Sequence, residues 1–171
     1  MNRFREYRND KAGYGMKIST RGKYGLRAMI DLALYSEQEA VSISSIAFRQ
    51  NISESYLEQL MAKLKKAGLV RSTRGAQGGY RLAYPMSDIS VGDVLRALEG
   101  DLRAVECSAQ TDEGCQGEEL CVTKYVWQRI NESIARTVDE MMLDQLVAES
   151  RKAQEKAKAH SVDYSQNSCS G

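Results

Sequence analysis

The sequence predicts a mainly α-helical protein with a single short hairpin. In most segments apolar residues recur every three or four positions, which is the period of a helix. Residues 70–82 differ, because two short strand-like runs flank a glycine-rich tip, and this pattern predicts a two-stranded hairpin. A helix directly precedes the hairpin. We therefore expect a helical fold in which one helix and the hairpin form a single unit.

The overall composition indicates a soluble globular protein. A chain of 171 residues fits one domain plus appendages, and a hydrophobic content of 42% is ordinary for such a protein. No apolar run approaches the roughly 20 residues of a membrane span, and the N-terminus lacks the apolar core of a signal peptide. We expect a cytoplasmic protein without membrane attachment.

Charge is distributed unevenly along the chain. The net charge is +1, but residues 1–89 hold 15 Lys/Arg against 8 Asp/Glu, a balance of +7. Residues 90–171 hold the remaining 9 basic and 15 acidic side chains, a balance of −6. A basic first half is suited to contact phosphates, while the acidic second half serves another purpose.

Two helices are expected before the central unit. Residues 1–15 are charged and aperiodic, so they predict a disordered extension, and Met16 would serve equally well as a translation start. Ser19 is a good N-cap for a helix that ends near Ser36. Its apolar stripe is predicted to comprise Leu26, Met29, Ile30, Ala33 and Leu34. A second, short helix is expected at residues 44–49.

The central unit begins with a helix whose two faces differ, which we call the reading helix. Ser53 is its expected N-cap, and Gly68 ends it. Its buried face is predicted to comprise Leu57, Leu60, Met61 and Leu64. Its opposite, polar face comprises Ser55, Tyr56, Glu58, Gln59, Lys63 and Lys66. The hairpin follows, with strands at residues 70–73 and 80–82 and a flexible tip at 74–79.

A helix backed by a basic hairpin is a winged helix-turn-helix, and we expect one at residues 16–100. The major groove of DNA admits one α-helix, and Gln or Ser side chains near the helix start reach base edges. The wing supplies Arg74 and Arg81, and its glycines allow close approach to a phosphate or a groove wall. The alternative is an ordinary amphipathic helix and hairpin with a solvated, charged face.

Three further helices are expected. Ser90 and Asp93 match a capping box for a helix at residues 91–98, which Gly100 ends. A long helix at 123–140 carries an apolar stripe: Val126, Ile130, Ile134, Val138 and Met141. A last helix at 143–157 carries Leu143, Leu146 and Val147, and a disordered polar tail is expected at 158–171.

The long helix is a candidate for dimerisation. Little chain remains to cover its stripe, so packing against a second copy is one explanation. Burial against the first helix would explain part of the stripe equally well. We assign residues 123–157 to dimerisation helices.

Three cysteines lie in a polar loop at residues 101–122. Seven residues separate Cys107 from Cys115, and five separate Cys115 from Cys121. Zinc sites favour closer pairs, whereas iron-sulfur clusters accept looser spacing because their ligands attach to more than one iron. Cluster ligation, a zinc site, and redox thiols or no function therefore stay open. Three thiolates would leave one position of a cluster exposed, which suits a sensor.

These pieces together resemble the Rrf-type family of winged helix-turn-helix transcription regulators. The matching segments span about residues 16–148. They are MKISTRGKYGLRAMIDLAL in the first helix, ISESYLEQLMAKLKKAGLVRSTRGAQGGYRL in the reading helix and wing, ISVGDVLRALEG in the next helix, and the cysteine loop ending in CVTKYVW.

The resemblance implies a homodimer in which the long helix crosses to its mate. The two reading helices would then face a pseudo-palindromic double-stranded DNA operator about one turn, roughly 34 Å, apart. The positions at which the family contacts DNA correspond to Ser53, Ser55, Tyr56, Gln59, Arg74 and Gly75. Glu58 occupies the position of an acidic side chain that discriminates between site classes, and Lys66 is expected to contact phosphate. Cys107, Cys115 and Cys121 correspond to the ligands of a 2Fe-2S cluster.

The chain departs from this family at the fourth cluster ligand. IscR-like members place a histidine three residues after the last cysteine, where this chain has Lys124. Another branch uses an aspartate near the start of the first helix, where this chain has Lys23. An ammonium group has no lone pair to donate to iron. The remaining candidates are His160, Cys169, Asp112, Glu113, Glu118 and Glu119.

The expected function is a sequence-specific transcriptional repressor or dual regulator, not an enzyme. Its DNA binding would be modulated by a 2Fe-2S cluster that senses iron-sulfur status, redox state or nitric oxide. One rival is a cluster-free regulator of cysteine or sulfur metabolism controlled by a partner enzyme. A second rival, a small redox protein that uses the cysteines directly, has little support because no Cys-x-x-Cys motif is present.

Overall fold

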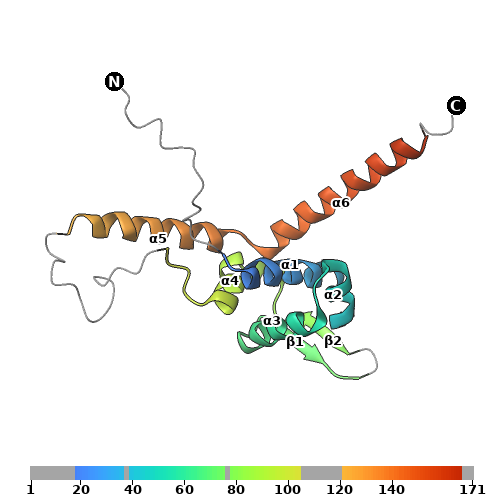
Figure 1. Cartoon of the computed structure of the whole chain (residues 1–171), viewed down its shortest axis with the longest axis horizontal. Coiled ribbons are helices and arrows are strands. Elements are labelled where there is room, and N and C mark those ends of the chain that lie inside the picture. The colour runs from blue at the N-terminus through green and yellow to red at the C-terminus, as the bar shows by residue number, and fades with distance from the viewer. Residues whose placement is uncertain (1–17, 37–38, 76–77, 105–120, 167–171) are drawn as a thin grey trace.

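Four helices and a hairpin form the body of the protein, and two longer helices extend from it (Figure 1). The computed structural model describes residues 18–36, 39–75, 78–104 and 121–166, with side chains described as far as Ala157. The body comprises α1 (Thr20–Tyr35), α2 (Ile43–Gln50), α3 (Glu54–Lys66), β1 (Val70–Thr73), β2 (Gly79–Leu82), the short 3-10 helix η1 (Met86–Asp88) and α4 (Val91–Glu99). The extending helices are α5 (Thr123–Glu140) and α6 (Leu143–Gln166).

Serine side chains cap the start of each α-helix in the body. Ser19, Ser42, Ser53 and Ser90 each accept a hydrogen bond from a backbone amide two or three residues further on. Asp93 also accepts from the backbone of Ser90, which completes the predicted capping box. The predicted starts of α1, α3 and α4 are confirmed. α2 begins earlier than predicted, because Ser42 and not a later serine provides its cap.

The hairpin lies where the sequence predicts it. β1 and β2 pair antiparallel, with Val70 opposite Leu82 and Arg71 opposite Arg81. β2 begins at Gly79, one residue before its predicted start. The backbone of Tyr80 also exchanges two hydrogen bonds, of 2.8 and 2.9 Å, with Val41 just before α2. β2 is therefore held on both sides, by β1 and by Val41 just before α2.

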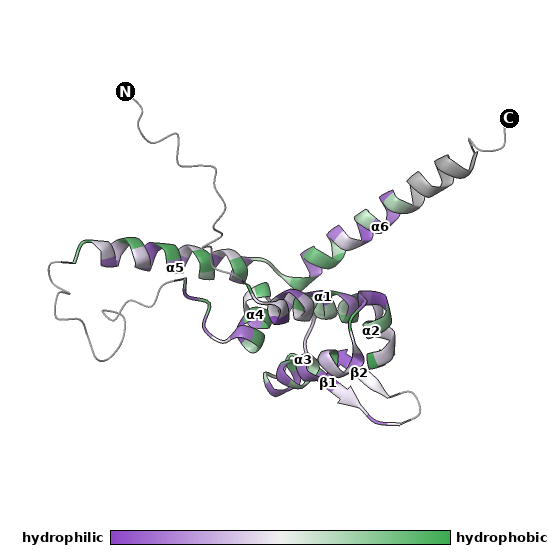
Figure 2. Cartoon of the chain, in the orientation of Figure 1, coloured by the Kyte–Doolittle hydropathy of each residue, from purple (hydrophilic) through white to green (hydrophobic). Residues whose placement is uncertain are grey.

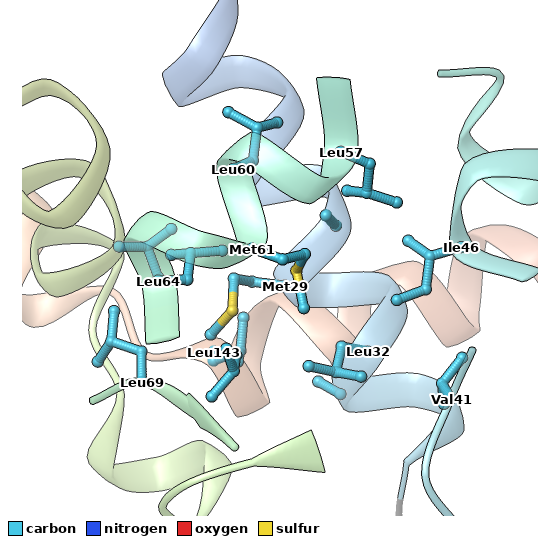
Figure 3. Close-up of a cluster of buried hydrophobic side chains, with 14 of the residues drawn as sticks. Met29, Leu32, Val41, Ile46, Leu57, Leu60, Met61, Leu64, Leu69 and Leu143 are labelled. Atoms are coloured by element: carbon cyan, nitrogen blue, oxygen red, sulfur yellow. The ribbon is translucent and has the colours of Figure 1, made fainter. Parts of the chain in front are cut away.

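One hydrophobic core unites the body with the start of α6. Figure 3 shows Met29 and Leu32 of α1 packed against the buried face of α3, with Leu143 of α6 beside them. The four residues predicted for the buried face of α3 are at most 1% exposed. Leu143 and Val147 are equally buried. The first turns of α6 therefore belong to the same hydrophobic core as α1 and α3.

The buried face of α1 is rotated from the predicted one. Leu26, Ile30 and Leu34 are only partly buried, whereas Gly22, Gly25, Ala28 and Leu32 are buried together with Met29 and Ala33. The cause is the close approach of α4, since a Cβ atom at Gly25 would lie 2.1 Å from Cδ1 of Leu98. The prediction was based on the large apolar side chains of α1, so it did not identify the face that packs through small residues.

The two C-terminal helices also differ in part from the prediction. α5 has the predicted bounds, but it packs against α4 and has no fully buried residue. The alternative in which α1 covers part of the apolar stripe of α5 is therefore not the arrangement that the structure shows. α6 continues to Gln166, so the prediction of a disordered tail from residue 158 is wrong as far as this residue. The run KAQEKAKA at 152–159 consists of good helix formers without Gly or Pro, which explains the continuation.

Glu99 joins the end of α4 to the start of α1. Its Oε1 accepts hydrogen bonds from the Ser19 hydroxyl at 2.5 Å and from the Gly22 amide at 2.8 Å. Arg21 lies 3.5 Å from the other carboxylate oxygen. Partial burial alone would raise the pKa of Glu99, but the hydrogen bonds and the charge of Arg21 lower it below its ordinary value. The ionised form therefore favours the folded state.

We expect Glu99→Gln to lower the free energy of unfolding by about 1–2 kcal/mol at pH 7, because a charged acceptor is lost. A depressed folded-state pKa gives stabilisation that is complete above the unfolded-state pKa and is lost as the pH falls through the folded-state pKa. The difference between the two proteins should therefore shrink towards zero in acid. Urea unfolding over a pH series measures it, and equal stabilities at pH 7 would contradict it. Glu149→Gln, in an exposed pair with Lys152, is the control that leaves stability nearly unchanged.

Candidate nucleic-acid interface and cysteine site

The polar face of α3 lies open to solvent on the side of the body away from α5 and α6 (Figure 1). Ser55, Glu58, Gln59 and Lys66 are exposed on it. Ser53 is also exposed, but its hydroxyl caps the helix by accepting from the Tyr56 amide at 3.4 Å. These four predicted contact residues of α3 therefore share one accessible face. The hydroxyl of Ser53 differs from them because it caps the start of the helix.

Tyr56 is held more firmly than an exposed contact residue. It is half-buried, and its ring meets that of Tyr24 of α1 edge to face, with centroids 6.2 Å apart and planes at 89°. The guanidinium of Arg27 lies 5.3 Å from the centroid of the Tyr24 ring. These ring contacts hold the Tyr56 side chain against α1. Tyr56 therefore helps to attach the reading helix to α1, in addition to its predicted contact with DNA.

A buried carboxylate orients the turn that leads into α3. Asp31 of α1 is 2% exposed and accepts two hydrogen bonds, of 2.6 and 2.9 Å, from Arg49 and one of 2.8 Å from Gln50. Gln50 in turn accepts from Arg27 through its side chain and its backbone carbonyl. Asn51 follows in the left-handed region, at φ 52°. These contacts fix the end of α2, and with it the direction of α3.

Sequence reasoning missed this network. The signal that could have revealed it is an aspartate inside an otherwise apolar run, AMIDLAL, at a position that the helical period places inside. A charged residue on a buried face needs a partner. Its partners lie 18 and 19 residues away, at a distance in sequence that local patterns do not report.

Cations gather at the end of α3 and along the wing. Lys63 donates to the carbonyl of Leu98 at 3.4 Å, and Lys65 donates to the Ser72 hydroxyl of β1 at 2.6 Å. These bonds tie α3 to α4 and to the wing respectively, which leaves the exposed Lys66 as the side chain of the three best placed for a phosphate. The positive charges of lysines in the last turn of α3 also interact favourably with the dipole of the helix.

The wing presents arginines on its outer side. Arg74 and Gly75 are exposed at the tip, and Gly75 has φ +120°, which a residue with a side chain rarely adopts. Arg71 is exposed on β1 directly opposite Arg81 of β2. Arg71 was not among the predicted contact residues.

Only one of the three loop cysteines falls within the described residues. Cys107 and Cys115 lie outside them, whereas Cys121 is placed two residues before α5, with Sγ 3.2 Å from the Thr123 hydroxyl. The hydrogen bond with Thr123 lowers the pKa of the Cys121 thiol, and the backbone amide and charge of Lys124 add to the effect. Thiolate is the form that binds metals, so Cys121 fits the ligand of a metal cluster.

The structure does not place a fourth ligand beside Cys121. Lys124 occupies the position expected for one, and its Nζ lies 5.4 Å from the centroid of the Tyr125 ring. Lys23 is exposed on α1. His160 belongs to the far part of α6, whose C-terminal end is at the opposite end of the molecule from the start of α5 (Figure 1). Within the described residues no group of three His, Cys, Asp or Glu side chains is arranged to hold a metal ion.

The remaining candidate ligands cannot be placed. Cys169, Asp112, Glu113, Glu118 and Glu119 all lie outside the described residues.

The first half of the α5 stripe is uncovered. Val126 is 50% exposed and Ile130 is 38% exposed, with Tyr125 and Val122 more exposed still. Further along, Ile134 and Val138 are half-buried against Leu95 and Leu102. Figure 2 shows apolar residues recurring along α5 where it projects beyond the body. Among the described residues of one chain, therefore, α4 covers only the end of the stripe.

None of the described helices combines the length and apolarity needed to span a bilayer.

The sequence profile of a known family matches most of the chain. The family described as "Rrf2: Iron-dependent Transcriptional regulator" matches residues 18–149. The chain is 41% identical over 157 residues to the HTH-type transcriptional regulator IscR of Vibrio cholerae, covering 89% of this chain and 90% of the relative. It is also 42% identical over 132 residues to IscR of Vibrio atlanticus, covering 77% of this chain and 75% of the relative.

Solved structures show the same likeness. T. potens IscR is 44% identical, with a TM-score of 0.66 over 84% of this chain and 94% of that one. CymR, the global cysteine regulator of B. subtilis, is 40% identical, with a TM-score of 0.65 over 77% of this chain and 96% of that one. The family match at residues 18–149 covers the helix-turn-helix, the wing, α5 and the start of α6.

Proposed function

The chain belongs to the Rrf2 family of transcriptional regulators, and from that premise we propose a homodimer that binds a pseudo-palindromic operator and holds a 2Fe-2S cluster. Membership makes it a DNA-binding regulator of transcription with a winged helix-turn-helix, and not an enzyme. The observation that carries the proposal is the exposed polar face of α3 beside an arginine-bearing wing. A protein of this kind acts where its operator is, so we assign it to the cytoplasm.

The side chains of α3 and the wing divide the work of DNA recognition. Gln59 and Ser55, near the start of α3, are of the type and length that reach base edges in the major groove, and Glu58 excludes bases that present only acceptors there. Lys66 and Arg74 supply positive charge for phosphates, and the tip at Gly75 allows backbone to come close to the duplex. Tyr56 and Ser53 hold the start of the helix in place.

Replacing Gln59 and Lys66 should separate base recognition from phosphate contact. We expect Gln59→Ala to weaken operator binding by ~1–3 kcal/mol and to relax specificity at one operator position. Lys66→Ala should weaken binding evenly across sequences and lower the salt dependence by about one charge. Titrations of operator and scrambled duplexes at several salt concentrations measure both effects. Equal losses on the two duplexes for Gln59→Ala would contradict the assignment.

The uncovered stripe of α5 supports the homodimer. Exposed apolar side chains on successive turns of a helix are costly in water and are typical of an interface. A second copy carries the same stripe, so two α5 helices can cover each other symmetrically. Such an arrangement would place two reading helices on one side of the dimer, as a two-fold symmetric operator requires.

A charge in the stripe should break the dimer. Ile130→Glu places a carboxylate in the middle of the apolar face, and we expect a shift to monomer in light scattering at micromolar concentration because that charge would be desolvated on association. Gln128→Glu adds the same charge on the opposite face of α5 and should leave the dimer intact. A dimer that survives Ile130→Glu, or is lost equally in both variants, would count against the α5 interface.

The cluster is assigned to Cys107, Cys115 and Cys121. Cys121 fits as a ligand, since its thiol is biased toward thiolate by Thr123 and Lys124. When bound, a 2Fe-2S cluster supplies a centre that responds to iron supply, oxidants or nitric oxide. Because Cys121 lies directly before α5, a change in how it is held would act on α5 and hence on operator affinity. Lys124 does not fit as the fourth ligand, and this weakens the hold on the second iron.

Anaerobic purification tests the cluster. We expect a coloured protein with about two iron and two sulfide per chain, a Cys121→Ser variant with much less, and operator affinity that differs between loaded and stripped protein. Lys124→His should slow cluster loss if the missing ligand sets lability. A colourless protein whose DNA binding is unchanged by chelation would instead support the alternative, a cluster-free regulator of sulfur metabolism controlled by a partner enzyme. The likeness to CymR favours that alternative.

A further inference from the structure

A bidentate ion pair joins α5 to the DNA-binding body. Arg96 of α4 donates from Nη1 to Oδ1 of Asp139 at 2.7 Å and from Nη2 to Oδ2 at 2.8 Å. The parallel geometry of the two bonds fixes direction as well as distance, which a single contact would not do. The bonds raise the pKa of Arg96 and lower that of Asp139, so both side chains stay charged near neutral pH.

The residues around the pair are shaped to accommodate it. A Cβ atom at Gly92 would lie 2.0 Å from Oδ1 of Asp139 and 2.8 Å from Nη1 of Arg96. A side chain at this position would displace the carboxylate of Asp139 from its place beside Arg96. The absence of a side chain at Gly92 therefore leaves room for the pair in this geometry.

A second attachment lies just beyond the pair. The Val91 amide donates to the carbonyl of Met141 at 2.8 Å, and the Leu143 amide donates to the carbonyl of Ile89 at 2.9 Å. These backbone bonds hold the junction of α5 and α6 and act as a pivot. The Arg96–Asp139 pair, less than a turn away, prevents α5 from tilting about it.

The angle of α5 is transmitted to the reading helix through α4. The C-terminal end of α4 is bonded to α3, since Lys63 donates to the carbonyl of Leu98. α4 also packs against α1 and α3 along its length. The orientation of α5 is thus defined relative to α3, with the Arg96–Asp139 pair as one of its attachments.

Small tilts of α5 would matter because it is long. Its 18 residues span about 27 Å at the helical rise. Rotation by about 10° at one end moves the other by about 5 Å, which exceeds the ~3.4 Å between base pairs. In a dimer joined through α5, that displacement changes the separation of the two reading helices.

We propose that the Arg96–Asp139 pair sets the separation of the two reading helices, and thereby the half-site spacing that the protein prefers in its operator. The inference rests on the proposed homodimer. The side chains of the pair are 42% and 44% exposed, so its contribution to folding is small and screened by salt. Its loss should therefore change geometry without unfolding the protein.

The test compares operators that share identical half-sites and differ by −1, 0, +1 and +2 base pairs between them. The variants are Arg96→Ala, Asp139→Asn and the charge exchange Arg96→Asp with Asp139→Arg. Lys152→Ala, which breaks an exposed ion pair on α6, is the matched control. Affinities are measured with the same cluster content in every protein, and light scattering gives the oligomeric state.

We expect the wild type and the control to prefer one spacing, and each single variant to reduce that preference at least three-fold while base preferences within the half-sites stay the same. The charge exchange should restore the preference in part. Dimeric variants with an unchanged spacing profile, or with equal loss at every spacing, would overturn this inference alone. A monomeric wild type would overturn it together with the proposed dimer.

Discussion

The buried carboxylate of Asp31 is the constraint on which the reading surface depends. A charge in the core is tolerated only when hydrogen-bond donors surround it, and Arg49 and Gln50 provide them from the end of α2. Those donors immediately precede the left-handed Asn51 that turns the chain into α3. The need to pair one carboxylate therefore fixes α1 against the helix-turn-helix, and the exposed face of α3 takes its direction from that contact.

α4 is the element through which the two halves of the molecule meet. It packs against α1 through Leu98 and the small residue Gly25, and against α5 through Arg96. The attachment to α1 is buried, since Leu98 is 2% exposed, whereas the side chains of the Arg96–Asp139 pair are 42% and 44% exposed. The proposed response of DNA binding to a cluster at Cys121 would need such a connection, because a rigidly fused pair of elements would have no second arrangement to adopt.

The cysteine site combines a favourable ligand with an unfavourable neighbour. Thr123 and Lys124 bias Cys121 toward thiolate, which promotes metal binding, yet Lys124 replaces a side chain that could complete the coordination. The ammonium group of Lys124 thus favours the thiolate form of Cys121, but it cannot itself serve as a metal ligand. A cluster held by three thiolates and a weak or exchangeable fourth group would be lost more readily than a fully ligated one, which is consistent with a sensor of cluster supply.

The sequence by itself determined the starts of α1, α3 and α4, the buried face of α3, the place of the hairpin strands and the bounds of α5, because caps and periodicity act over a few residues. It also pointed to Cys107, Cys115 and Cys121 and to the polar face of α3. Only the tertiary structure decided which face of α1 is buried, what partners Asp31 has, and that Asp139 meets Arg96 across 43 residues of chain. Those outcomes depend on which helices approach closely, and close approach is a property of the packed fold that no local pattern contains.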